Sequence, residues 1–158
     1  MARVYASPQG AAIGGKMGPA TNFIGAKVML FAGDQLIVLQ RDHAPGIPWP
    51  GLLDFPGGGR EGLESAQDCV LRETFEETGL RLDPTGLRFV HNRPTRGSYG
   101  VFYAYHGPPA LLDFVRFGGE GDGWLHMAPR AYVGSDQAIP PFAEILSNYL
   151  ESIGIAGA

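Results

Sequence analysis

Cysteine, long apolar runs and basic charge are all scarce in this sequence of 158 residues. The single cysteine, Cys69, cannot form an internal disulfide, which fits a reducing cytoplasm and predicts a small buried residue. The apolar run at residues 28–32 is far shorter than the roughly 20 residues that cross a bilayer, and the N-terminal residues lack the apolar stretch of a secretory signal. We therefore expect a cytoplasmic protein with no membrane partner.

The charge balance argues against a nucleic-acid partner. Twelve Lys and Arg residues stand against 16 Asp and Glu, for a net charge of −4, and a net negative surface repels phosphate backbones. The four histidines and one cysteine also lack the spacing of a zinc site.

Glycine and proline, by contrast, are abundant, at 24 and 13 residues, about twice the average share of roughly 12%. This excludes a coiled coil, a helical repeat or an all-helical bundle, because an interior Gly costs a helix about 1 kcal/mol and an interior Pro about 3 kcal/mol. The 44% hydrophobic content is enough for one core. We expect a flexible segment at residues 1–21 and a single domain at residues 22–158.

Hydrophobic periodicity predicts a mixed α/β (α+β) domain. A helix is expected from Ser65 as N-cap to Thr78, with Gly79 as C-cap, and a second helix after Pro140-Pro141. A proline-rich loop covers residues 43–52. Strands are predicted at residues 26–32, 35–41, 53–55, 87–91, 100–106, 111–117 and 124–127, with a hairpin turn at Gly33-Asp34.

The first helix carries an unusual group of acids. Glu73, Glu76 and Glu77 lie within an arc of about 100°, while the opposite flank, with Thr74 and Phe75, is expected to pack on a sheet. Like charges at this spacing destabilise a helix, and a hard divalent cation with oxygen ligands, Mg²⁺ or Mn²⁺, would relieve the repulsion. The alternative is an ordinary solvated acidic face.

The stretch from Gly58 to Leu80 resembles the signature of the Nudix hydrolases, G-x5-E-x7-R-E-U-x-E-E-x-G-U, in which U is a bulky aliphatic residue. The matching positions are Gly58, Glu64, Arg72, Glu73, Glu76, Glu77, Gly79 and Leu80, and Thr74 departs from the pattern at one U position. The resemblance implies the Nudix fold, a mixed sheet sandwiched between helices. It also implies divalent-metal-dependent hydrolysis of a diphosphate linkage in a nucleoside diphosphate derivative.

A competing pattern, G-x-G-x-x-G at Gly57, Gly59 and Gly62, would suggest a dinucleotide-binding turn. Its context disagrees, because Arg60-Glu61 stands where a pyrophosphate would approach and the helix that follows repels anions.

The family resemblance also implies roles for individual residues. Glu76, Glu77 and the carbonyl of Gly57 would bind metal, and Glu73 would serve as general base or as a further ligand. Glu64 would support them and Arg72 would orient the glutamates. Family members often recruit another acid from a loop, for which residues 118–123 offer Glu120, preferred over Asp122 for its reach. The alternative is an exposed acidic turn.

For substrate binding, we expect Arg41 to meet a phosphate and Trp49 to stack on a base. The alternatives are a surface charge at a strand end and a core anchor. The predicted substrate is a small-molecule nucleotide, foremost a nucleoside triphosphate hydrolysed in a house-cleaning role. An ADP-ribose or nucleotide-sugar pyrophosphatase is the alternative enzyme. A non-catalytic nucleotide-binding module is the alternative of another class, against which the costly acidic cluster argues.

Overall fold

The computed structural model describes residues 18–119 and 121–155. Most of the segment expected to be flexible, residues 1–17, and the loop acid Glu120 lie outside this described part. Residues 18–20 are tied to the body of the protein, since the Asn92 side chain donates to Gly18 O at 2.9 Å and accepts from Ala20 N at 3.0 Å.

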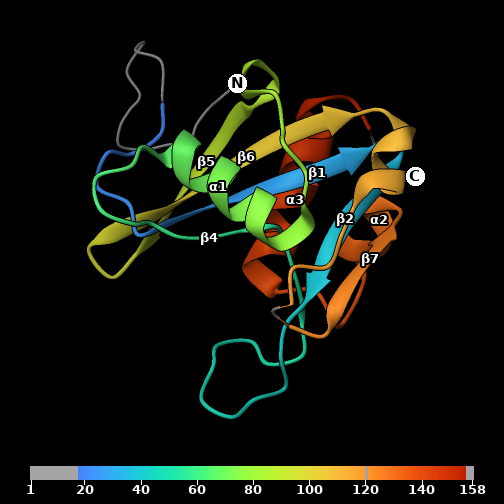
Figure 1. Cartoon of the computed structure of the whole chain (residues 1–158), viewed down its shortest axis with the longest axis horizontal. Helices are drawn as coiled ribbons and strands as arrows, with labels where there is room; N and C mark the ends of the chain where they lie inside the picture. Colours follow the sequence, from blue (N-terminus) through green and yellow to red (C-terminus); the bar gives the residue numbers. More distant parts are fainter. Residues whose placement is uncertain (1–17, 120, 156–158) are drawn as a thin grey trace.

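Within the described residues, seven strands form one mixed sheet (Figure 1). They are β1 (Gly25–Ala32), β2 (Gln35–Gln40), β3 (Leu53–Asp54), β4 (Gly57–Gly59), β5 (Arg88–Thr95), β6 (Ser98–Gly107) and β7 (Gly123–Met127). The order along the main path is β3-β2-β1-β6-β5, with β4 beside β1 and β7 beside β2. The β1–β6 pair is parallel and the other pairs are antiparallel. The predicted hairpin at Gly33-Asp34 is confirmed.

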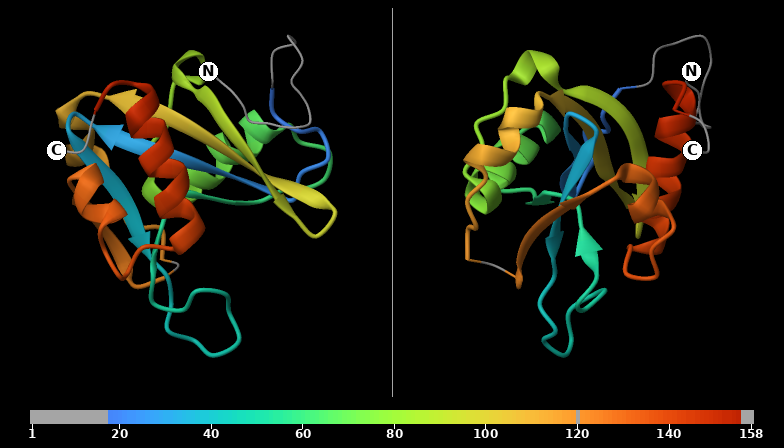
Figure 2. Two further views of the ribbon diagram at one scale, coloured as in Figure 1. Left: turned by 180° about the vertical axis from the view of Figure 1, so that it is seen from behind. Right: turned by 90° about the vertical axis from the view of Figure 1, so that its right-hand side faces the viewer.

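Helices cover both faces of the sheet (Figure 2). Helix α1 (Ala66–Thr78) lies on one face, and α2 (Pro129–Val133) and α3 (Pro140–Ser152) lie on the other. Two short 3₁₀ helices, η1 (Pro84–Gly86) and η2 (Pro109–Phe114), complete the elements. The expected mixed sheet between helices is therefore confirmed. Among the described residues, no helix is both long and apolar enough to cross a membrane.

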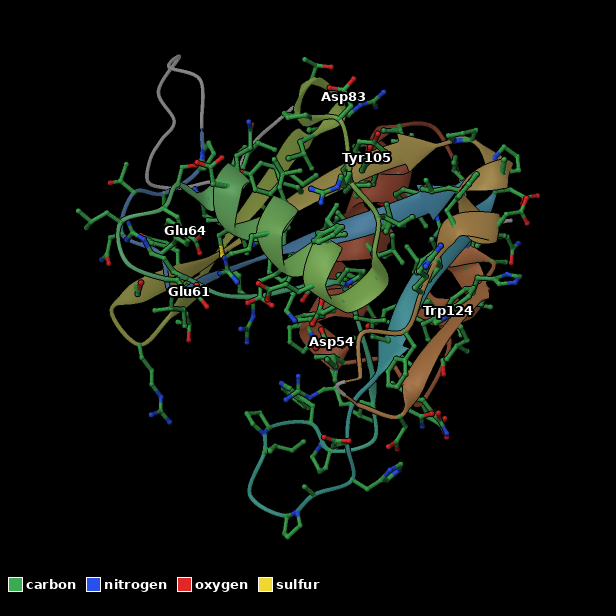
Figure 3. The ribbon with its side chains drawn as sticks, in the orientation of Figure 1. Asp54, Glu61, Glu64, Asp83, Tyr105 and Trp124 are labelled. Carbon is green, nitrogen blue, oxygen red and sulfur yellow. The ribbon has the colours of Figure 1, made fainter. Side chains whose placement is uncertain are left out.

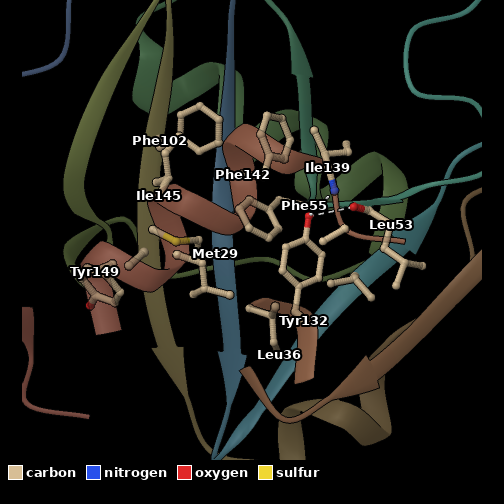
Figure 4. Close-up of a cluster of buried hydrophobic side chains, with 14 of the residues drawn as sticks. Met29, Leu36, Leu53, Phe55, Phe102, Tyr132, Ile139, Phe142, Ile145 and Tyr149 are labelled. Carbon is tan, nitrogen blue, oxygen red and sulfur yellow. Dashed lines mark hydrogen bonds between the residues drawn. The ribbon is translucent and has the colours of Figure 1, made fainter. Parts of the chain in front are cut away.

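Side chains alternate along β1 between two cores, as a strand requires. Val28 and Leu30 pack toward α1, and Met29 and Phe31 pack toward α3. In the core beneath α3, the buried Tyr132 hydroxyl donates to Leu53 O at 2.8 Å and accepts from Ile139 N at 3.3 Å (Figure 4). These bonds fix the position of β3, and with it the position of Asp54, the residue that follows Leu53.

Both ends of α1 lie where the sequence predicted them. Ser65 Oγ accepts from Asp68 N at 3.0 Å, and Gly79 adopts a left-handed φ of 75° while its N–H bonds to Phe75 O. A serine N-cap and a glycine C-cap satisfy backbone groups that the helix itself leaves unpaired.

Two predictions of local structure, and one of the alternatives, were wrong. The strand expected at residues 111–117 is instead η2 followed by extended chain, because the prolines at its start offer no N–H to a strand ladder. Phe75 does not pack on the sheet; it is 38% exposed, with the Arg81 guanidinium 4.0 Å from its ring centre. Trp49 is not a core anchor, since it is 41% exposed. Strand β4 and helix α2 were not foreseen.

Candidate active site

The candidate site lies where α1 crosses the glycines of β4. Glu77 Oε1 accepts a hydrogen bond from Gly57 N at 2.8 Å. The Glu73 carboxylate rests so closely on the next glycine that a Cβ added at Gly58 would overlap it. Gly57 itself has a φ of 135°, and a Cβ there would overlap Ala26 O on β1. Two carboxylates therefore converge on the Gly57–Gly58 backbone, and a side chain at Gly58 would displace that of Glu73.

Arg72 holds the rest of the acidic flank together. Its Nε and Nη2 donate to the two Glu64 oxygens at 3.0 and 2.7 Å, and its Nη1 donates to Glu73 at 3.0 Å and to Glu76 at 3.3 Å. Nη2 also donates to Gly59 O at 2.9 Å. One guanidinium thus joins three signature glutamates to β4, and a planar five-donor group suits this task better than a lysine would.

The signature glutamates Glu64 and Glu77 have pKa values shifted in opposite directions by their surroundings. The Arg72 hydrogen bonds lower the pKa of Glu64 to about 2. Burial raises the pKa of Glu77 to about 7; the Gly57 N–H and the charge of Lys27 oppose this, and the charges of Asp54 and Glu73 add to it. Glu64 therefore stays ionised at neutral pH, whereas Glu77 is poised near the point where it takes up a proton.

Figure 3 shows that the site extends along α1, with Glu61 and Glu64 toward its N-terminal end and Asp54 toward its C-terminal end. Glu76 is the most open of the signature glutamates, with 56% of its side chain exposed. In the described part of the chain, no three His, Cys, Asp or Glu side chains are already grouped as a metal set. The acids are instead held by Arg72 and by the Gly57 N–H.

Lys27 and Asp54 belong to this region, although the sequence analysis missed both. Asp54 is 6% exposed, and its Oδ2 accepts from Lys27 Nζ at 3.0 Å and from Arg41 Nη1 at 2.9 Å. Lys27 Nζ also donates to Gly57 O at 3.2 Å. The signal was present, because each is a charged residue inside an otherwise apolar strand, and a buried charge needs a partner.

Two loops flank the site and are joined to each other. Arg41 Nε donates to Pro48 O at 2.8 Å, which fixes the guanidinium against the proline-rich loop that carries Trp49. His43 Nδ1 lies 2.7 Å from Asp122 Oδ2, and Asp122 N donates to Gln40 O at 2.9 Å. Of the two candidate loop acids, Asp122 is therefore already paired, while Glu120 lies outside the described residues.

The donor set suits a hard divalent cation. The groups on α1 and β4 are carboxylates and a backbone carbonyl, the ligand types that Mg²⁺ and Mn²⁺ prefer. Glu77 contacts the N–H of Gly57 and Glu73 lies against Gly58, the two residues that the Gly57 carbonyl joins.

Comparison with known proteins agrees with this fold. A family model described as NUDIX domain matches residues 21–132. The chain therefore belongs to the Nudix family and is a Nudix hydrolase acting on phosphorus-containing acid anhydrides.

Three solved structures illustrate the fold relationship. The MutT protein from Methanosarcina mazei Go1 has 18% identity and a TM-score of 0.67 over 87% of this chain and 99% of its own. A C. elegans Ap4A hydrolase has 15% identity and a TM-score of 0.58 over 82% and 96%. A bifunctional NMN adenylyltransferase/ADP ribose pyrophosphatase from Francisella tularensis, complexed with AMP and Mn ion, has 20% identity and a TM-score of 0.59 over 84% and 42%. At these identities the likeness is one of fold.

Proposed function

We propose that this protein is a Mg²⁺-dependent nucleotide pyrophosphatase, with a nucleoside triphosphate as its foremost substrate. The observation that carries the proposal is the convergence of Glu73 and Glu77 on the Gly57–Gly58 backbone. Ordinary surface glutamates would spread into solvent, whereas these two are held against a peptide that has no side chain. The repulsion they retain is offset when a divalent cation binds.

The proposed residue roles are those that the resemblance to the Nudix signature implies. Glu76, Glu77 and the Gly57 carbonyl bind the cation, and Glu73 is a further ligand or the base that takes the proton of the attacking water. Glu64 and Arg72 position these glutamates. When bound, the cation neutralises phosphate oxygens and lowers the pKa of the attacking water.

Further groups bring the substrate into place. The Arg41 guanidinium uses Nε and Nη1 on protein oxygens, which leaves Nη2 to meet a phosphate. Trp49 is exposed on the adjoining loop and offers its ring to a base. From the loop at residues 118–123 we propose Glu120 as an additional acid.

A substrate panel tests this proposal. Nucleoside triphosphates, including oxidised ones, ADP-ribose, nucleotide sugars and dinucleoside polyphosphates are incubated with Mg²⁺, and the products are separated by anion-exchange chromatography. We expect the fastest turnover with a nucleoside triphosphate, and a loss of about 100-fold in kcat for Glu76→Gln and for Glu77→Gln. Glu151→Gln, an exposed change on α3, is the matched control.

The outcomes separate the alternatives. Faster turnover of ADP-ribose or a nucleotide sugar would assign the other enzyme class. Nucleotide binding with no turnover of any member of the panel would assign a binding module instead.

A further inference from the structure

The Asp54 carboxylate combines deep burial with an unused acceptor. Both cations that contact it, Lys27 and Arg41, donate to Oδ2. The other oxygen, Oδ1, is buried and has no hydrogen-bond partner among the residues that the structure describes. An ionised oxygen buried without a donor is costly, so Oδ1 calls for a hydrogen-bond donor that binds there.

Lys27 connects the Asp54 carboxylate to the proposed metal position. Its Nζ lies 3.0 Å from Asp54 Oδ2 and 3.2 Å from Gly57 O, so these two oxygens are at most about 6 Å apart. Lys27 thus holds the Asp54 carboxylate near the carbonyl that would bind the cation. Mg²⁺ keeps several of its waters when it binds to a protein, and such waters would donate to a nearby acceptor.

We propose that Asp54 is a positioning residue that accepts, at Oδ1, a hydrogen bond from a water bound to the divalent cation. This inference rests on the proposed function. Lys27 and Arg41 fix Asp54 from its other oxygen, so the free oxygen has a defined direction. The carboxylate thus orders the water shell of the ion without touching the ion itself.

Asp54→Asn tests the proposal with little change of shape. The amide oxygen takes the Oδ2 position, where Lys27 and Arg41 both donate, and this leaves the amide NH₂ at the Oδ1 position. A donor then faces the water that needs an acceptor. Mn²⁺ alone is titrated into the full-length protein, without nucleotide, and the free ion is counted by its EPR signal.

We expect Asp54→Asn to weaken Mn²⁺ binding by about 10- to 100-fold. The proton ENDOR spectrum of the bound ion, which reports the hydrogen bonding of its waters, is also expected to change. Asp34→Asn is the matched control, because Asp34 is exposed at the far end of β1; its Mn²⁺ affinity should stay within about twofold of the parent's. A merely structural role for Asp54 would leave the ENDOR spectrum unaltered.

Each result decides the point. Parent-like Mn²⁺ affinity in Asp54→Asn overturns the inference and leaves the proposed function standing; a raised KM for nucleotide in the same variant would assign Oδ1 to the substrate. Absence of Mn²⁺ binding by the parent protein would instead overturn the proposed function. If Asp54→Asn does not fold, Asp54→Glu replaces it, and parent-like affinity and ENDOR spectrum in that variant overturn the inference equally.

Discussion

Glu77 accepts a 2.8 Å hydrogen bond from the backbone N–H of Gly57, and this contact fixes the C-terminal half of α1 over the glycine strand. It brings this signature carboxylate to the residue whose carbonyl we propose as a metal ligand. Burial of this carboxylate makes the stability of the metal-free protein depend on pH.

Glu77 should destabilise the metal-free protein as pH rises. Its pKa is about 7 in the folded chain and 4.5 ordinarily, so between these values the folded state binds more protons than the unfolded state. The free energy of unfolding therefore falls from about pH 4.5 to about pH 7 and is level above that range. Glu64, with a pKa lowered to about 2, contributes a constant amount over the same range.

Urea unfolding in EDTA at pH 5 and pH 8 measures this effect. Glu77→Gln keeps an acceptor for Gly57 N but cannot ionise. We expect the stability of Glu77→Gln relative to the parent to rise by about 1 to 3 kcal/mol between the two pH values. Parallel pH profiles for the two proteins would contradict the burial of an ionisable Glu77.

Gly58→Ala should abolish most activity while Gly59→Ala is tolerated. A Cβ at Gly58 overlaps the Glu73 carboxylate, whereas a Cβ at Gly59 has only Ile24 O nearby, at 3.9 Å. Both glycines lie in β4, and neither has a positive φ, so backbone strain is the same for the two changes. We expect kcat to fall by about 100-fold in the first variant and by less than about threefold in the second. Equal losses of kcat in the two variants would show that the close contact between Glu73 and Gly58 does not matter for activity.

Arg72→Lys should lower kcat by about 10- to 100-fold and change thermal stability little. An ammonium cannot donate to both Glu64 oxygens and reach Glu73 at once, so the glutamates lose their common anchor. Arg60→Lys, in the loop between β4 and α1, is a control, because Arg60 donates to the backbone oxygens of Glu64 and Thr21 instead of to the acids. A kcat in Arg72→Lys equal to that of the parent would remove Arg72 from a positioning role.

Thr74 is the one departure from the family pattern. Its replacement by Val should change the stability of the protein in the opposite direction from the same replacement at Thr78. Both are fully buried, but Thr74 Oγ1 has no partner among the described residues, whereas Thr78 Oγ1 donates to Thr74 O at 2.7 Å and accepts from Leu80 N at 3.2 Å. We expect Thr74→Val to raise the free energy of unfolding by about 1 kcal/mol and Thr78→Val to lower it by about 1 to 2 kcal/mol. Thermal and urea unfolding measure both; a loss of stability in Thr74→Val would show that its hydroxyl is paired.

Local chemistry explains which parts of the fold could be foreseen. The ends of α1 follow from Ser65 and Gly79, because caps act within a few residues of the chain. The apolar period after Pro140 likewise predicted α3. The segment after Pro109 was wrongly predicted as a strand because its apolar residues resemble one. Its position is set by contacts with a distant part of the chain, since Arg116 N and Gly118 N donate to the last carbonyls of α1.

The acidic flank of the site was predictable and its surroundings were not. Spacing on one helix places Glu73, Glu76 and Glu77 together whatever the tertiary fold. Lys27 and Asp54 are 27 positions apart along the chain, and they meet only because β4 pairs with β1 beyond the end of β2. No local pattern encodes that meeting.

We propose above all that the α1 glutamates and the Gly57 carbonyl form a divalent-metal site. Isothermal titration of the full-length protein with Mg²⁺ at pH 8, alongside Glu73→Gln, Glu77→Gln and the control Glu151→Gln, tests it most directly. We expect the parent and the control to bind Mg²⁺ saturably, and we expect each site variant to bind Mg²⁺ at least about tenfold more weakly. Affinity in Glu73→Gln and Glu77→Gln equal to that of the parent, or a parent protein that binds no Mg²⁺, would contradict it.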